Sequence, residues 1–376
     1  MKAVIVSSSY SYLERVELLK EYYDSKGYDT TVLLTDFIHA NKEYATWEKE
    51  GYVLIQTYPY QKNISVARLY SHHKFAKDVA AHLEQLDIDI LHVLLPANSL
   101  AKVARQYKEK YPNVRLHLDI IDLWPETMPI SRFKRTYPFE YWRSLRDDNL
   151  DNADTVYCEC NLFIQVMKKQ DDKRFKTLYW IKTTNPIDTI PMLSKDELHL
   201  CYLGSINNVI DIDYIVTMCM ELGKHRKVVL HIVGDGEKRE ELLKRMENTE
   251  AEVIYHGFVF EPEKKQSIFD VCHFGLNIMK PSVCVGLTMK SLDYFQAGLP
   301  IINNIQGDTA DMVDTYKIGF NGYQELLERL QELQDEDFLV MRQNVKKLYY
   351  DKFTKEAFVK RLEENDESSR NIIGNL

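Results

Sequence analysis

Short apolar runs alternate with amphipathic stretches along the first half of the chain. The apolar runs predict buried strands at 3–6, 30–34, 53–57, 90–95, 114–121 and 155–160. Apolar residues at helical spacing predict helices at 12–26, 67–86 and 100–111. Strands that alternate with helices favour right-handed βαβ units and a parallel sheet of Rossmann type.

The second half repeats this alternation. Strands are predicted at 199–203, 228–233, 253–257, 274–279 and 299–302, and helices at 238–246, 289–296, 325–334, 338–352 and 355–365. A chain of 376 residues is longer than a single hydrophobic core usually supports. We therefore expect an α/β protein with two domains, at 1–190 and 198–352, followed by a C-terminal helix and tail at 353–376.

Composition describes a globular protein, with 45% hydrophobic and 28% charged residues. The net charge of -9 argues against wholesale nucleic-acid binding, which normally requires a basic domain. The N-terminal apolar run is too short for a signal peptide, and no apolar stretch reaches 18 residues. The six cysteines form no C-x-x-C pair, so we expect reduced thiols and a cytoplasmic location.

The segment 274–304 carries the clearest candidate chemistry. Its loop, from Pro281 to Thr288, leads into the start of a predicted helix, where free backbone amides and the positive end of the helix dipole suit a diphosphate. Lys290 adds a full charge there, and Asp293 follows on the same helical face as an acceptor for sugar or ribose hydroxyls. The alternative interpretation is an ordinary strand–loop–helix unit with a solvated lysine.

This segment resembles the donor-binding signature of GT-B-fold glycosyltransferases, especially family 4, which reads P-S-x-x-E-G and then E-A-x-x-x-G-x-P-V-I. The residues at matching places are Pro281, Ser282, Gly286, Gly298, Pro300 and Ile302. Val285 and Asp293 stand where the family has its two glutamates. The resemblance implies two Rossmann-like domains that face each other across a cleft, with the donor bound by the second.

The resemblance also implies the donor-binding residues. It places Gly204 under the diphosphate, Lys290 and the amides of 286–291 on the same group, and Asp293 on the ribose. The remaining donor-site residues that it implies are Ser205, Gly234, Gly257, Phe258, Gly286, Leu287, Thr288 and Ser291. Phe258 and Phe260 are candidates for stacking on the base, and core packing is the alternative. No cation follows Gly204, where the family usually has an arginine and a lysine.

In the first half, the segment LHLDIIDLWPE (116–126) places acids and an aromatic residue at the end of a predicted strand. It resembles a D-L-W-P-E segment in the acceptor domain of many bacterial family 4 enzymes. We expect Asp122 to contact the acceptor or to set the charge of the site, with Glu126 as the second candidate. The alternative is that Asp122 caps a turn and Trp124 packs.

The stretch 132–146 contains five basic residues, five aromatic residues and one acid. This mixture is typical of a peripheral contact with an anionic membrane. Nucleic-acid binding and a solvated loop are the alternatives. The D-x-D pairs at 87/89 and 211/213 are more economically interpreted as caps than as metal ligands, and the GT-B resemblance implies no cofactor and no required metal.

The resemblance implies a hexosyltransferase that moves a sugar from a nucleotide-sugar, expected to be a UDP-sugar, to a glycan or lipid-linked acceptor. The resemblance further implies retention of configuration and a role in bacterial exopolysaccharide or capsule synthesis at the inner face of the membrane. Two alternatives remain open at this point. One is a catalytically inactive glycosyltransferase-like partner subunit, and the other is a nucleotide-sugar epimerase of related fold.

Overall fold

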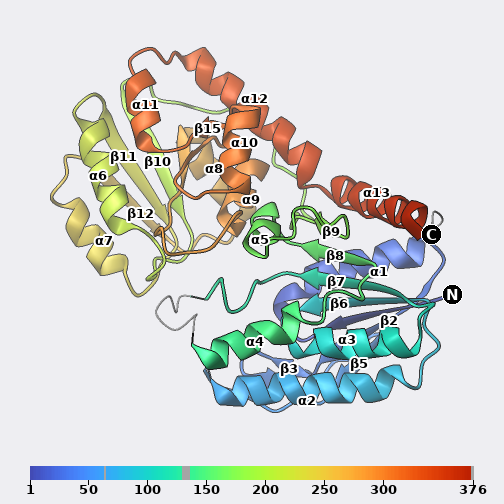
Figure 1. Ribbon diagram of the computed structural model, residues 1–376. Helices are drawn as coiled ribbons and strands as arrows, with labels where there is room; N and C mark the ends of the chain where they lie inside the picture. Colours follow the sequence, from blue (N-terminus) through green and yellow to red (C-terminus); the bar gives the residue numbers. More distant parts are fainter. Residues whose placement is uncertain (63–64, 129–135, 374–376) are drawn as a thin grey trace. The chain divides into compact units, whose positions relative to one another are not determined.

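The computed structural model describes residues 1–62, 65–128 and 136–373. They form two compact units (Figure 1). Unit 1 comprises residues 1–180 together with 359–376, and unit 2 comprises 181–358. The chain therefore leaves unit 1 after Trp180, ahead of the expected boundary at 190.

Unit 1 is built on a seven-stranded sheet in the order β5-β2-β1-β6-β7-β8-β9. Every neighbouring pair is parallel, as the apolar runs predicted. The strands are β1 (Lys2–Ser7), β2 (Asp29–Thr35), β5 (Tyr52–Ile55), β6 (Ile90–Leu95), β7 (Arg115–Ile120), β8 (Thr155–Cys158) and β9 (Phe175–Thr177). A small antiparallel hairpin, β3 (Phe37–Ile38) and β4 (Glu43–Tyr44), lies outside this sheet.

Helices α1, α2, α3 and α5 pack on this sheet, and α4 packs against α3. In α3, Leu100, Ala104 and Tyr107 recur at helical spacing and are buried. The elements are η1 (Tyr10–Tyr12), α1 (Leu13–Ser25), α2 (Val66–Leu83), α3 (Ser99–Lys110), α4 (Tyr137–Asp147) and α5 (Asn161–Val166).

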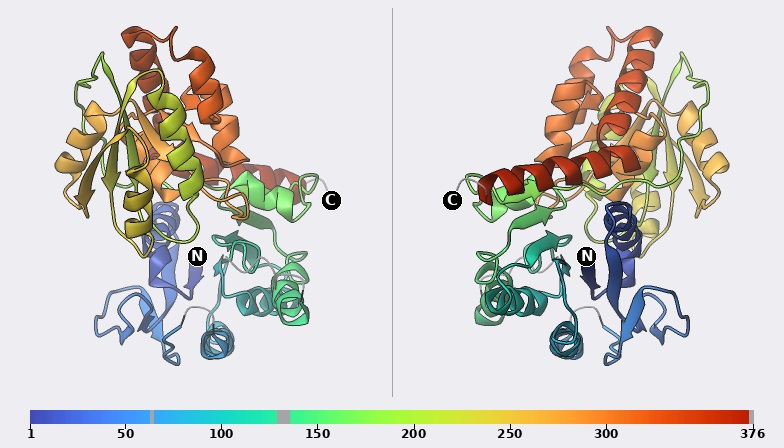
Figure 2. Two further views of the ribbon diagram at one scale, coloured as in Figure 1. Left: turned by 90° about the vertical axis from the view of Figure 1, so that its left-hand side faces the viewer. Right: turned by 90° about the vertical axis from the view of Figure 1, so that its right-hand side faces the viewer.

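Unit 2 has a six-stranded sheet in the order β12-β11-β10-β13-β14-β15, again parallel throughout. The strands are β10 (Glu197–Leu203), β11 (Lys227–Val233), β12 (Glu252–Gly257), β13 (Phe274–Asn277), β14 (Ile301–Asn303) and β15 (Gly319–Phe320). Figure 2 shows helices on both sides of this sheet. They are α6 (Ile212–Gly223), α7 (Arg239–Met246), α8 (Pro262–Val271), α9 (Met289–Gln296), α10 (Asp308–Tyr316), α11 (Tyr323–Arg329) and α12 (Asp335–Lys352).

Two Rossmann-like α/β units with parallel sheets confirm the fold class predicted from the sequence. The last helix, α13 (Lys355–Ile373), begins in unit 2, and its residues from Val359 onward belong to unit 1. Among the described residues, no helix combines the length and the apolar character that a membrane crossing requires.

Candidate functional site

Glycine turns end the three adjacent strands β10, β11 and β12 of unit 2. The Gly204 amide donates to the Val233 carbonyl at 2.8 Å, and the Gly234 amide donates to the Gly257 carbonyl at 2.7 Å. Gly234 has a φ of +129°, and a Cβ there would lie 2.1 Å from the Gly204 carbonyl oxygen. Only glycine permits this close approach. The turns are thereby locked together at the carboxyl edge of the sheet, where ligands bind in folds of this kind.

A cavity of about 570 Å³ opens above these turns. Its lining includes Gly204, Ser205 and Gly234, together with Phe258 and Phe260 from the segment after β12. Phe258 is 63% exposed and Phe260 is 82% exposed. Their rings are nearly parallel, with centroids 5.8 Å apart. The alternative that these residues pack in the core is therefore wrong, and the pair presents a flat apolar surface of the kind on which a nucleobase stacks.

Lys290, in the first turn of α9, lies beside Gly204. A Cβ on Gly204 would be 4.0 Å from the Lys290 Cε. The Lys290 amine is 4.4 Å from the centroid of the Tyr202 ring and 3.4 Å from its hydroxyl oxygen. Burial lowers the pKa of Lys290 from 10.5 to about 8. Within the described part of unit 2, no carboxylate lies within ion-pair distance of this amine, so the site offers a desolvated cation to an anion.

Thr288 caps the N-terminus of α9. Its hydroxyl oxygen accepts a hydrogen bond from the Ser291 amide at 3.1 Å, and the hydroxyl donates to the Asn277 side chain at 2.8 Å. Among the described residues, the amides of Met289 and Lys290 have no acceptor. The helix therefore presents two free donors next to the Lys290 charge.

The other predicted residues of this loop are buried or hydrogen-bonded within unit 2. The side chains of Leu287, Thr288 and Ser291 are buried. The Gly286 carbonyl accepts from the amide and the hydroxyl of Thr309, at 2.9 and 2.7 Å. These residues fix the shape of the loop. The start of α9 therefore presents its backbone amides, rather than these side chains, to a ligand.

Asp293 occupies different surroundings, although it follows Lys290 by three residues. Its carboxylate accepts from Lys265 at 2.8 Å and forms an ion pair with Lys182 at 3.3 Å. These three residues line a second cavity of about 300 Å³ in unit 2, to which Gln296 also contributes. Sequence reasoning treated Asp293 as an acceptor open to ribose hydroxyls and missed both lysines, which come from distant parts of the chain. Its ribose contact remains a prediction.

In unit 1, Asp122 lies just beyond β7, at the carboxyl edge of the sheet. The Tyr12 hydroxyl donates to its carboxylate at 2.6 Å, and burial raises the pKa of Asp122. Sequence reasoning missed Glu159, which follows the neighbouring strand β8 directly. Burial, together with the nearby Asp122 charge, raises the pKa of Glu159 well above its usual range. The sequence feature that could have identified Glu159 is an acidic residue immediately after a buried strand.

Glu126, the second expected acid, is held by arginines. It accepts from Arg143 at 2.6 Å and from Arg146 at 3.2 Å. Burial alone would raise the pKa of Glu126, but the Arg146 charge and the arginine hydrogen bonds lower it overall. A paired carboxylate with a lowered pKa is a poor proton acceptor, so these contacts favour a role in fixing α4, and a catalytic role for Glu126 remains a prediction.

The same contacts change the interpretation of the basic stretch 132–146. Residues 132–135 lie outside the described residues, and α4 forms the remainder. Arg143 and Arg146 are engaged with Glu126, whereas Tyr137 and Tyr141 are exposed. The described part of the stretch thus presents tyrosines rather than free cations.

No metal site emerges in the part of the chain that the structure describes. Within residues 1–62, 65–128 and 136–373, no three or more His, Cys, Asp or Glu side chains are grouped as a metal ion would need. Asp211 caps α6 by accepting from the Tyr214 amide at 3.0 Å, as the capping interpretation predicted. Asp213 contacts Arg245.

Residues 197–335 match the family model described as glycosyl transferases group 1. This segment contains the glycine turns, the cavity, Lys290 and α9. No curated protein has a sequence that matches this chain.

Solved structures of similar fold cover nearly the whole chain. The lipopolysaccharide outer core galactosyltransferase WaaB has a TM-score of 0.69 and 15% identity, covering 98% of this chain and 99% of its own. Anabaena Alr3699/HepE in complex with UDP-glucose has a TM-score of 0.61 and 12% identity, covering 98% and 100%. WaaG, a glycosyltransferase involved in lipopolysaccharide biosynthesis, has a TM-score of 0.60 and 12% identity, covering 99% and 100%. The chain therefore has the fold of the GT-B glycosyltransferases, and its residues 197–335 carry the match to glycosyl transferases group 1.

Proposed function

We propose that this protein is a glycosyltransferase that moves a sugar from a UDP-sugar to a glycan or lipid-linked acceptor. The observation that carries the proposal is the desolvated Lys290 amine, which lies beside Gly204 with no carboxylate partner in the described part of unit 2. A buried cation without a counter-ion is costly unless an anion binds there. HepE, with a similar fold, binds UDP-glucose, which supports a uridine nucleotide as the donor.

The proposed donor pose follows from the geometry of unit 2. The diphosphate lies against Lys290 and the free amides of Met289 and Lys290, while the base stacks on Phe258 in the 570 Å³ cavity. In the transfer, the bond from the anomeric carbon to the diphosphate oxygen breaks and a bond to the acceptor oxygen forms. Negative charge grows on the leaving diphosphate, which is where a fixed cation and helix amides stabilise it most.

The proposal includes retention of configuration without a metal ion. The leaving diphosphate then takes the acceptor proton on the same face of the sugar. In this scheme the protein supplies position and charge, and Lys290 has the central role. Asp293 stands in the family's ribose position, and ribose hydroxyls would share its carboxylate with Lys265 and Lys182.

Unit 1 is proposed to bind the acceptor at the edge formed by Asp122, Glu159 and Tyr12. A neutral acid beside a hydrogen-bonded carboxylate offers both donors and acceptors to sugar hydroxyls. The proposed setting is stepwise assembly of a bacterial surface polysaccharide, an exopolysaccharide or capsule, on the cytoplasmic face of the membrane. Exposed Tyr137 and Tyr141 on α4 are compatible with contact at that surface.

Two observations favour a second candidate, a catalytically inactive partner subunit. Val285 replaces an acid of the family signature, and Asp293 is already paired with two lysines. An inactive subunit could keep the fold and lose the sugar contacts. This candidate predicts that no sugar is released even where the nucleotide binds.

Calorimetric titration of the full chain with UDP, GDP and dTDP tests the proposal. The titrations are repeated on Lys290→Ala and on the matched variant Lys347→Ala, which removes an exposed lysine of unit 2. We expect UDP to bind, the Lys290 variant to lose at least tenfold in affinity, and the Lys347 variant to match the wild type. Slow hydrolysis of UDP-sugars, measured in parallel, separates an active enzyme from a partner subunit. Absence of binding by all three nucleotides would overturn the donor site.

A further inference from the structure

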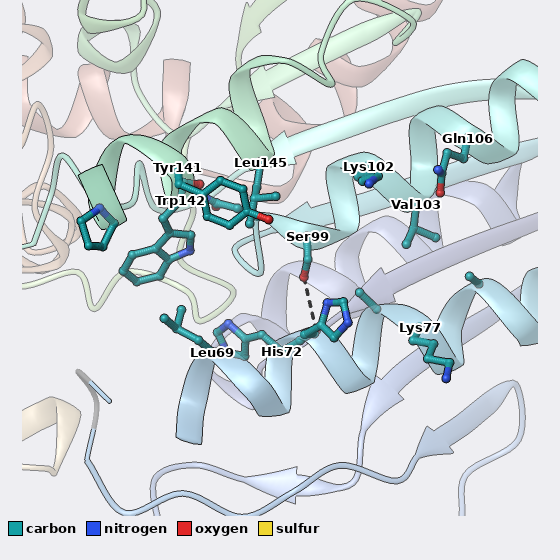
Figure 3. A pocket seen from close by; sticks show the side chains of 15 residues that line it. Leu69, His72, Lys77, Ser99, Lys102, Val103, Gln106, Tyr141, Trp142 and Leu145 are labelled. Atoms are coloured by element: carbon teal, nitrogen blue, oxygen red, sulfur yellow. Dashed lines mark hydrogen bonds between the residues drawn. The ribbon is translucent and has the colours of Figure 1, made fainter. Parts of the chain in front are cut away.

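A pocket between α2, α3 and α4 in unit 1 lies apart from the residues assigned above. Its volume is about 590 Å³, within the range of roughly 300–1,000 Å³ that small-molecule sites occupy. Figure 3 shows Leu69 on α2, Val103 on α3, and Trp142 and Leu145 on α4 around it. Ala80, near the C-terminal end of α2, also lines the pocket. The interior is therefore suited to an aliphatic group.

Two lysines from facing helices stand at one end of this pocket. Lys77 on α2 and Lys102 on α3 both line it, and both are exposed. Figure 3 shows them on the side of the pocket away from Leu69 and Trp142, with Gln106 beyond Lys102 along α3. Within the described part of unit 1, neither lysine has an acidic partner, and the lining contains no Asp or Glu. The pocket thus has apolar walls that are interrupted by the polar residues His72, His73, Asn98, Ser99 and Gln106, and it has two cations on one side.

Neighbouring cations on the same helices differ from this pair. On α2, Lys74 bonds to Asp78 at 2.5 Å, and on α3, Arg105 bonds to Glu109 at 2.8 Å. The unpaired state of Lys77 and Lys102 is therefore a property of the pocket end rather than of the helices in general. Unpaired lysines on both sides of one opening favour an anionic group between them.

The surface around the opening is unusually apolar. Val66, Leu69 and Tyr70 on α2 are exposed, as are Tyr137 and Tyr141 on α4. Their helical spacing places the α2 residues on the face that also carries Lys77 and Ala80. Exposed aliphatic and tyrosine side chains next to lysines suit the headgroup and acyl boundary of a membrane better than open water.

We propose that this pocket binds one acyl chain of an anionic membrane phospholipid, with the headgroup phosphate between Lys77 and Lys102. The chain lies in the pocket between α2, α3 and α4, alongside Ala80, Val103 and Trp142. Val66, Tyr70 and Tyr137 rest in the headgroup region. The site would hold the protein on an anionic leaflet without a membrane-crossing helix.

This inference goes beyond the proposed glycosyl transfer and does not depend on it. Vesicle binding needs no nucleotide and uses residues of unit 1, whereas UDP binding reports on unit 2. Failure of one measurement therefore leaves the other intact.

The test is co-sedimentation of the full chain with phosphatidylcholine vesicles, with and without phosphatidylglycerol. Ala80→Phe places a ring in the pocket, and Ala81→Phe places the same ring on the adjacent exposed position as the matched control. The double variant Lys77→Gln/Lys102→Gln removes the cations, and Lys173→Gln removes an exposed lysine elsewhere in unit 1. Circular dichroism of each variant verifies folding.

We expect wild-type binding only when phosphatidylglycerol is present. Each pocket lysine should contribute about fivefold, so the double variant should lose roughly 25-fold, with little change in Lys173→Gln. Ala80→Phe should lose at least tenfold relative to Ala81→Phe. Equal binding of those two variants would mean adsorption at the surface without chain insertion, and would overturn the proposal. Equal binding to vesicles with and without phosphatidylglycerol would overturn the proposed contact between the two lysines and an anionic headgroup.

A second measurement keeps the proposal testable if Ala80→Phe fails to fold. Phosphatidylglycerol that carries a doxyl quencher on its acyl chain should quench tryptophan fluorescence, because Trp142 lines the pocket. Trp124→Phe/Trp142→Phe should remove most of that quenching, because the Trp124 ring lies 5.9 Å from the Trp142 ring and would be quenched as well. Trp47→Phe, a distant tryptophan of unit 1, should retain the quenching. Retained quenching in the double variant would show that the chain lies elsewhere.

Discussion

Replacement of Lys290 by methionine should stabilise the free protein while it weakens donor binding. The methionine keeps the length of the aliphatic stem and removes the charge. Burial lowers the pKa of Lys290 from 10.5 to about 8. A difference of 2.5 pH units corresponds to about 3 kcal/mol against the charged form. This folded-state pKa already reflects all contacts of the charged amine, including the Tyr202 ring 4.4 Å away. A net gain of about 3 kcal/mol at pH 7 follows.

The pH dependence of this gain identifies its origin. Between pH 8 and 10.5 the unfolded wild type holds the Lys290 proton and the folded wild type has released it, so wild-type stability rises with pH across that window. The methionine variant has no such group. Its advantage should therefore be full below pH 8 and should vanish by about pH 10.5. Urea unfolding of both proteins at pH 7, 9 and 10.5 measures this difference.

Donor affinity should move in the opposite direction. A hydrogen bond to a charged group contributes about 1.5–3 kcal/mol, so UDP affinity should fall by roughly 10- to 150-fold in Lys290→Met at pH 7. In the wild type, affinity should also decline as pH rises above 8, because the free amine must take up a proton to bind the diphosphate. A Lys347→Met variant should show neither effect. A Lys290→Met protein that is less stable than the wild type at pH 7, or that binds UDP equally well, would refute this reasoning.

Three further predictions concern other parts of the molecule. The double variant Phe258→Ala/Phe260→Ala should lose about 1–3 kcal/mol of UDP affinity by calorimetry, and its unfolding free energy should stay within about 0.5 kcal/mol because both rings are exposed. Burial raises the pKa of Glu159 well above its usual range, so wild-type stability should fall as pH rises above 4.5, by up to about 1.4 kcal/mol per unit, and Glu159→Gln should remove that slope in urea titrations at pH 5 and 7. Arg15→Met should cost about 3–5 kcal/mol of stability, because it leaves the fully buried Asp119 carboxylate without its partner 2.7 Å away, and Arg15→Met/Asp119→Leu should recover most of the loss.

Most helices and strands could be predicted from the sequence. Thr288 and Gly298 bracket a helix predicted at 289–296, and α9 has these bounds. The apolar run 228–233 lies within β11, as a strand buried on both faces requires. Boundaries shifted where the signal was weak: the run 299–302 gives a strand at Ile301–Asn303, because Leu299 and Pro300 still belong to the turn after α9. Periodicity reports short-range geometry, and such geometry depends on neighbouring residues.

The sequence identified several residues of the candidate sites but not their contacts or their exposure. Gly204 and Lys290 were each singled out, but their contact depends on β10 lying next to β13, the strand that leads to α9. The exposure of Phe258 could not be predicted either, because an aromatic residue after a strand is as compatible with a core as with a surface. Strand order and exposure result from the packing of the whole sheet, which no local pattern contains.

The sequence by itself determined two parallel α/β units and the positions at which loops, acids and cations follow the strands. Only the tertiary structure decided which of these groups meet. It paired Glu126 with Arg143 and Arg146, joined Asp293 to two lysines, and left Lys290 without a carboxylate partner in the described part of unit 2. The physical reason is that a charge acts over a few ångströms of space. Residues that are distant in the chain become neighbours only through the order of the strands.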